Sequence, residues 1–124
     1  MPVPMTEEQL EAYRATARRT RAEESQRAVD RLDRAREAAR EGARILRERF
    51  GASSVMVFGS LAEEEWFGAS SDIDFAATGV REEDYFVAVA ALQGLLGEFE
   101  ADLVDLDRCT PGLREGILAG GFEL

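Results

Sequence analysis

At 124 residues the chain is long enough for one domain with a modest hydrophobic core. Its formal net charge of −10 makes nucleic acid an unlikely partner, and the absence of His excludes His-based metal sites and His general bases. A single cysteine, Cys109, cannot form an internal disulfide, and the sequence has neither a secretory leader nor a long apolar run. We therefore expect a soluble, cytoplasmic protein that makes no membrane contact.

The first fifty residues predict helix. Thr6 and Gln9 fit a capping box, and the segment from there to Phe50 is rich in helix formers and contains no Pro. Residues 18–27 lack a large apolar side chain, so one long helix and two helices with a bend both stay open. The apolar residues that recur at three- and four-residue steps predict one buried stripe, formed by Val29, Leu32, Ala35, Ala39, Ala43, Leu46 and Phe50. We divide the chain into an N-terminal helical extension, 1–50, and a domain, 51–124.

Arginine is frequent in the extension, and most of it alternates with Glu or Asp at spacings that favour ion pairs along a solvated helix. Arg18, Arg19 and Arg21 form a cluster without an acidic neighbour inside it, for which an acidic protein partner is a more economical target than RNA. A helix of this length is longer than a small domain can cover. Part of it is therefore free to bind a partner, or a second copy of the chain in a homo-oligomer.

The region from Val55 to Ala77 carries the residues that indicate chemistry. One strand-like run ends in Gly59 and Ser60, and a second carries Asp72 and Asp74. Because side chains alternate across a strand, the two carboxylates share one face, and a divalent cation such as Mg²⁺ would relieve their repulsion. Gly59 would let the backbone approach a ligand, and Ser60 could hold phosphate oxygens. The Gly59-Ser60 pair and the Asp72/Asp74 pair would each fit an ordinary turn, but the two together favour a ligand-binding site.

The rest of the chain predicts a helix, a strand, a second helix and a short final strand. Residues 82–99 predict a helix that is buried through Phe86, Val89, Ala90, Leu92, Leu95 and Leu96. A strand follows at 101–107, Pro111 fits the first turn of a helix that ends near residue 120, and 122–124 can add a strand. This order predicts a mixed α/β (α+β) fold, with helices packed against a small mixed sheet.

The run GSLA at residues 59–62, followed by SDIDF at 71–75, resembles the signature of the nucleotidyltransferase superfamily with the polymerase-beta-like fold. Residues 101–124 are similar to the end of minimal nucleotidyltransferases, the MNT family, which is often paired with a HEPN-domain toxin. The resemblance covers roughly residues 50–124. It implies that Asp72, Asp74 and Asp102 are the catalytic residues and Mg²⁺ ligands, and that Gly59 and Ser60 hold the phosphates of ATP.

The same resemblance implies Mg²⁺-dependent transfer of AMP from ATP to a hydroxyl group of a HEPN-type toxin, which would make the protein an antitoxin. In the loop after Ser60, the residues Glu63, Glu64 and Glu65 replace a basic stretch common in the family. Three carboxylates there would oppose a bound triphosphate. A second interpretation is therefore a catalytically degenerate binding module that neutralises or scaffolds a partner by contact.

Two further alternatives concern the substrate and the loop. A small-molecule nucleotidyltransferase acting on a cationic, aminoglycoside-like substrate would suit the acidic charge, although we would expect a second domain to form its cleft. Trp66 and Phe67 would either stack on a base or anchor the loop through hydrophobic contact.

Overall fold

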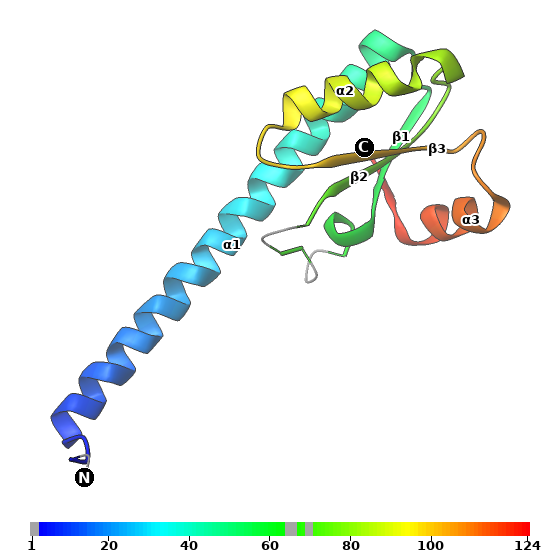
Figure 1. Cartoon of the computed structure of the whole chain (residues 1–124). Helices are drawn as coiled ribbons and strands as arrows, with labels where there is room; N and C mark the ends of the chain where they lie inside the picture. The colour runs from blue at the N-terminus through cyan, green and yellow to red at the C-terminus, as the bar shows by residue number, and fades with distance from the viewer. Residues whose placement is uncertain (1–2, 64–66, 69–70) are drawn as a thin grey trace.

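The computed structural model describes residues 3–63, 67–68 and 71–124 (Figure 1). A long helix leads into a four-stranded sheet with two further helices. The elements in chain order are α1 (Glu7–Phe50), β1 (Ser54–Phe58), the 3-10 helix η1 (Gly59–Leu61), β2 (Ile73–Thr78), the 3-10 helix η3 (Glu82–Asp84), α2 (Tyr85–Leu96), β3 (Ala101–Asp105), α3 (Pro111–Gly120) and β4 (Phe122–Glu123). The predicted class, a mixed α/β fold with a small mixed sheet behind a long N-terminal helix, is confirmed.

The N-terminal segment forms one helix of 44 residues, α1, which is about 66 Å long at 1.5 Å per residue. At its N-terminus Thr6 and Gln9 form a reciprocal capping box, and at its C-terminus Gly51 ends the helix in the left-handed region at φ 72°. No bend interrupts it at 18–27. Within the described residues, no helix combines the length and the apolarity needed to cross a membrane.

The sheet has the strand order β3-β2-β1-β4. β1 lies antiparallel to both β2 and β4, whereas β2 and β3 are parallel. A parallel pair needs a crossover connection, and the segment that contains η3 and α2 supplies it. The C-terminal residue also joins this scaffold, since the amide of Leu124 donates to the carbonyl of Val55 over 3.0 Å and its own carbonyl accepts from Arg47.

Helices cover both faces of the sheet (Figure 1). The larger core lies where α1 and α2 pack on one face, and its fully buried members include Leu46, Phe75 and Leu92. The smaller core lies under α3 on the other face, where Ile117 packs with Ala76 and Leu106. Only the C-terminal part of α1 belongs to this packing, because its buried residues begin at Ala35. The rest of the helix projects away from the sheet.

Two details of the predicted core are wrong. Val29 was placed on the buried stripe of α1 but is 52% exposed, because the helix has already left the sheet at that point. On α2, Phe86 is 83% exposed, Leu95 is 41% exposed and Ala90 is also exposed, while Ala88 is buried instead. Tyr85–Leu96 contains no charged residue, so its sequence does not distinguish a buried face from a solvent face.

Candidate active site

Three carboxylates lie close together where strands β2 and β3 begin, and we call this place the carboxylate edge. Asp74, in β2, is the register partner of Asp102 in β3, and register partners of parallel strands point to the same face at a strand separation of about 4.8 Å. Asp72 lies directly before β2. Ile73 and Phe75 are fully buried in the larger core, so the aspartates that alternate with them point away from it. The structure thus brings Asp72, Asp74 and Asp102 together.

The central carboxylate is electrostatically strained. Partial burial, followed by the charges of Asp102 and Asp72, raises the pKa of Asp74 to about 6. Its ordinary value is 3.8. The cluster therefore holds more negative charge at neutral pH than its surroundings stabilise, and a bound cation would relieve it.

The chemistry of the donor set fits Mg²⁺, which prefers oxygen ligands and is usually held by one or two carboxylates together with substrate phosphates. Among the residues that the structure describes, no three His, Cys, Asp or Glu side chains converge closely enough to form a ready-made metal cage. The carboxylate edge therefore fits an ion that arrives with a phosphate-bearing substrate.

The turn after β1 brings backbone directly against this edge. Gly59 has φ +69°, and a Cβ atom built on it would lie 2.3 Å from Oδ2 of Asp74. Only glycine fits here, both because of its conformation and because of the carboxylate beside it. Ser60 follows in η1 and is half-buried. Of the two predicted phosphate-binding residues, Gly59 therefore lies against the carboxylate of Asp74, and Ser60 is its neighbour in the chain.

A groove of about 250 Å³ continues from Gly59 along α3. Its floor is open because Gly112, Gly116 and Gly120 carry no side chain, and Glu63 is exposed at its rim. None of the described residues that line it is a cation. A polyphosphate in this groove would depend on metal ions for charge neutralisation.

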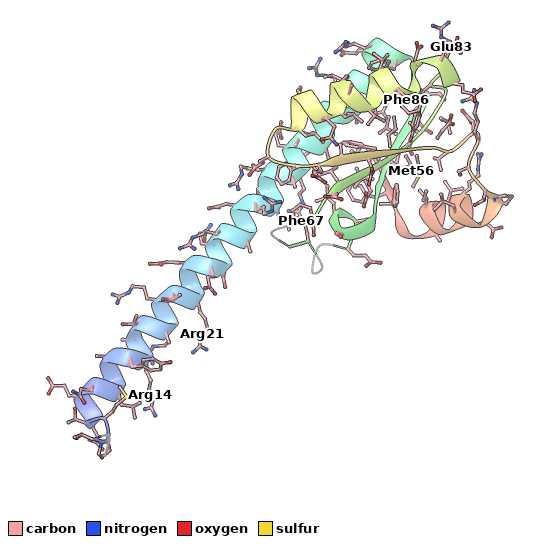
Figure 2. All side chains as sticks on the ribbon, in the orientation of Figure 1. Arg14, Arg21, Met56, Phe67, Glu83 and Phe86 are labelled. Carbon is pink, nitrogen blue, oxygen red and sulfur yellow. The ribbon has the colours of Figure 1, made fainter. Side chains whose placement is uncertain are left out.

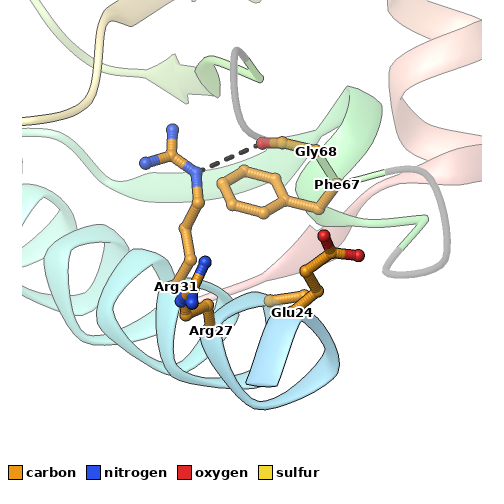
Figure 3. Close-up of a pocket in the computed structure, with 6 residues that line it drawn as sticks. Glu24, Arg27, Arg31, Phe67 and Gly68 are labelled. Atoms are coloured by element: carbon orange, nitrogen blue, oxygen red, sulfur yellow. Dashed lines mark hydrogen bonds between the residues drawn. The ribbon is translucent and has the colours of Figure 1, made fainter. Parts of the chain in front are cut away.

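The loop between the two motifs is anchored to α1 (Figure 3). Phe67 packs against Phe99, with ring centroids 6.1 Å apart. The guanidinium of Arg31 lies 4.7 Å from the Phe99 ring centroid and 5.7 Å from that of Phe67, and Nε of Arg31 donates to the carbonyl of Gly68 over 3.2 Å. Of the two alternatives for Phe67, the structure shows anchoring.

Several residues of interest in this loop lie outside the described part of the chain, namely Glu64, Glu65 and Trp66.

Arg31 was missed as an organising residue, because the extension was interpreted as a solvated helix with local ion pairs. Its position four residues before the buried Ala35 was the available signal, since it puts a cation on the stripe that faces the domain.

The comparisons with known proteins agree with this geometry. The profile of the polymerase beta nucleotidyltransferase family matches residues 42–124. A solved structure described as a minimal nucleotidyltransferase is 36% identical, with 71% of this chain and 91% of that chain covered and a TM-score of 0.59. No curated protein matches.

Toxin–antitoxin complexes share the fold. A toxin–antitoxin structure with AMP-PNP is 23% identical over 64% of this chain, with a TM-score of 0.58, and this chain spans 66% of that chain's length. The complex of a tri-AMPylated Shewanella oneidensis HEPN toxin with an MNT antitoxin gives 19% identity, 72% and 70% coverage of the two chains, and a TM-score of 0.57.

The fold and the carboxylate edge together define a nucleotidyltransferase class of protein. The chain belongs to the polymerase beta nucleotidyltransferase family and, within it, to the minimal nucleotidyltransferases.

Proposed function

We propose that this protein is a Mg²⁺-dependent nucleotidyltransferase that moves AMP from ATP to a hydroxyl group of a HEPN-type toxin, and so acts as its antitoxin. The observation that carries the proposal is the meeting of Asp72, Asp74 and Asp102 at one sheet edge, against the backbone of Gly59. Support for the donor and the acceptor comes from relatives of the same fold, one solved with AMP-PNP and one in complex with a tri-AMPylated HEPN toxin.

Each residue of the proposed site would have a role that follows from its position. Asp72 and Asp74 would hold the metal that accompanies the triphosphate, and Asp102 would complete the site on the side of the acceptor. Bound Mg²⁺ neutralises phosphate charge and stabilises the entering and leaving oxygens of an in-line displacement. Gly59 and Ser60 would hold the β and γ phosphates, and the glycine-lined face of α3 leaves room beside them.

The proposed reaction is a balanced exchange at the α-phosphorus. The acceptor oxygen forms a bond to that phosphorus, the bond from the phosphorus to the bridging β-phosphate oxygen breaks, and pyrophosphate leaves. Asp102 accepts the proton of the acceptor hydroxyl, because it is exposed at the edge of the cluster and the chain has no His.

One observation supports a second candidate function. Glu63 is exposed at the rim of the groove, beside Gly59, and no cation among the described lining residues offsets it. This arrangement favours a module that neutralises its partner by contact alone.

Intact-mass spectrometry separates the two functions. The protein is incubated with ATP, Mg²⁺ and a HEPN-domain protein as the acceptor. We expect the mass of the partner to rise by whole AMP units. The gain should be lost with Asp72→Ala/Asp74→Ala and retained with Asp105→Asn, which changes a nearby carboxylate that is bound instead to Arg108.

The control is complex formation, measured on the same samples by size-exclusion chromatography. A tight complex without any mass gain in the wild type would establish the contact-only module and refute AMP transfer. An equal mass gain in the double variant would show that the carboxylate edge is not the catalytic site.

A further inference from the structure

The free part of α1 carries four arginines without a partner. The side chains of Arg14, Arg18, Arg19 and Arg21, called here the basic band, make no ion pair or hydrogen bond with any other described residue. Further along α1, by contrast, Arg34 pairs with Glu98 over 2.7 Å and Arg44 pairs with Glu41 and Glu48, each over 2.8 Å. The band is therefore an unsatisfied positive surface on a chain of net charge −10.

Two members of the band, Arg14 and Arg21, lie on the side of α1 that faces the domain. Arg14, Arg21, Ala28 and Ala35 follow one another at intervals of seven residues, or two helical turns, and therefore share one face. Ala35 is fully buried in the domain core, and Ala28 lines a pocket beside the domain. Figure 2 shows Arg14 and Arg21 reaching out from α1 on that side.

A pocket lies between the helix and the loop that precedes Asp72. It has a volume of about 230 Å³ and is lined by Glu24, Arg27, Ala28, Arg31, Phe67 and Gly68 (Figure 3). Arg14 lies about 21 Å along the helix from Ala28, at 1.5 Å per residue. The pocket thus continues the helix face as far as Phe67 and Gly68, in the loop that precedes Asp72.

We infer that this surface docks an acidic helical segment of the acceptor protein, so that the segment lies along α1 while the acceptor hydroxyl reaches the carboxylate edge. The inference rests on the proposed function and adds the place where the acceptor is held. The basic band lies before residue 42, outside the part of the chain that matches the family.

Charge favours an acidic protein segment over other occupants. A helix with a few carboxylates matches the four arginines and then ends, whereas a polynucleotide would continue its negative charge onto a domain that repels it. The surface also offers apolar contact, because Tyr13 is 65% exposed and Phe67 is half-buried at the pocket. An amphipathic helix with one acidic flank meets both conditions.

The test compares two double charge reversals on the same helix. Arg14→Glu/Arg21→Glu alters the basic band, and Arg40→Glu/Arg44→Glu makes the same change in net charge at exposed positions outside it. Binding of each variant to the same HEPN-domain protein is measured by calorimetry at about 50 and 300 mM salt. AMP transfer to that protein is measured in parallel by intact mass.

We expect the Arg14/Arg21 reversal to weaken binding at least about tenfold at low salt and less at high salt, because exposed charge pairs are screened. The Arg40/Arg44 reversal should leave the affinity within about twofold. If the Arg14/Arg21 reversal weakens binding but none of the proteins, wild type included, transfers AMP, the docking surface is supported and the proposed function is rejected. Unchanged binding with normal AMP transfer rejects the docking surface alone.

Two other readouts identify a different occupant. If the Arg14/Arg21 reversal leaves partner affinity intact but abolishes binding of a single-stranded 20-nucleotide RNA, the surface binds RNA and the inference is wrong. If instead it dissociates a homodimer seen by light scattering, the occupant is a second copy of the chain, and the inference is again wrong.

Discussion

At the scale of single residues, the carboxylate edge is a place where the fold is less stable than it could be. Asp74 is held beside Asp72 and Asp102, and Gly59 closes against its oxygen so that the side chain has little room to move away. Such strain is expected where a site is built to receive an opposite charge. A substitution that removes the charge of Asp74 should therefore stabilise the metal-free protein.

The stabilisation should depend on pH with a defined sign. The pKa of Asp74 is raised from 3.8 to about 6 in the folded protein. Folding therefore favours the protonated form, and the contribution of Asp74 to the free energy of unfolding is highest below about pH 4 and falls as the pH rises through about 6. We expect Asp74→Asn to raise the free energy of unfolding by about 1 kcal/mol at pH 7.5, after allowance for solvent screening, and to have little effect at pH 4.

Thermal unfolding in EDTA at the two pH values measures this effect. Glu115→Gln, at an exposed position on α3, is the control and should change little at either pH. Equal stabilisation by Asp74→Asn at pH 4 and pH 7.5 would contradict the electrostatic explanation.

At the scale of elements, the contact between α1 and the sheet depends on one glycine. A Cβ atom on Gly42 would lie 2.6 Å from Cζ of Phe75 and 3.1 Å from Cδ2 of Leu92, and both of these side chains are fully buried. Gly42 therefore lets α1 approach β2 and α2 closely at the centre of the larger core.

Gly42→Ala should destabilise the protein although alanine is the better helix former. The gain in helix propensity is about 1 kcal/mol, whereas forcing a methyl group into this packing costs about 1–3 kcal/mol and also shifts the Phe75 ring. Gly94→Ala in α2 is the matched control, because nothing lies within 4 Å of a Cβ atom built there. Urea unfolding should show a loss for Gly42→Ala and a gain for Gly94→Ala, and a gain for both would refute the close contact.

At the scale of the whole molecule, the chain combines a packed domain with a free helical arm. In α1 the residues from Arg18 to Asp30 are all exposed, whereas Ala35, Ala39, Ala43 and Leu46 are buried in the core. A polar helix without tertiary contacts contributes little to the stability of a domain. The arm is thus available for binding at small energetic cost.

Deletion of residues 1–25 should leave the melting temperature within about 2 °C of the full-length value, because it removes no core contact. Leu46→Ala is the contrasting change within the same helix, and should cost about 2–5 kcal/mol because Leu46 is fully buried. Circular dichroism measures both the melting temperature and the loss of helix that the deletion must produce. A collapse of the whole fold on deletion would show that the arm is part of the core.

The sequence by itself determined the features that depend on neighbours along the chain. The caps at Thr6 and Gly51 follow from short-range hydrogen bonds, and the shared face of Asp72 and Asp74 follows from the alternation of a strand. The composition of residues 7–50 likewise predicted helix, and left open whether it forms one helix or two with a bend. Asp102 was placed by family resemblance alone, since nothing local to residues 101–105 relates it to Asp74.

Only the tertiary structure decided which surfaces meet. The register between β2 and β3 puts Asp102 beside Asp74, and the packing of α2 buries Ala88 and exposes Phe86 in a helix whose sequence is apolar on every side. The same holds for Arg31 between two aromatic rings and for Gly42 against Phe75. These contacts join residues far apart in the chain, and their free energy depends on how the elements pack together, which the local pattern of side chains does not specify.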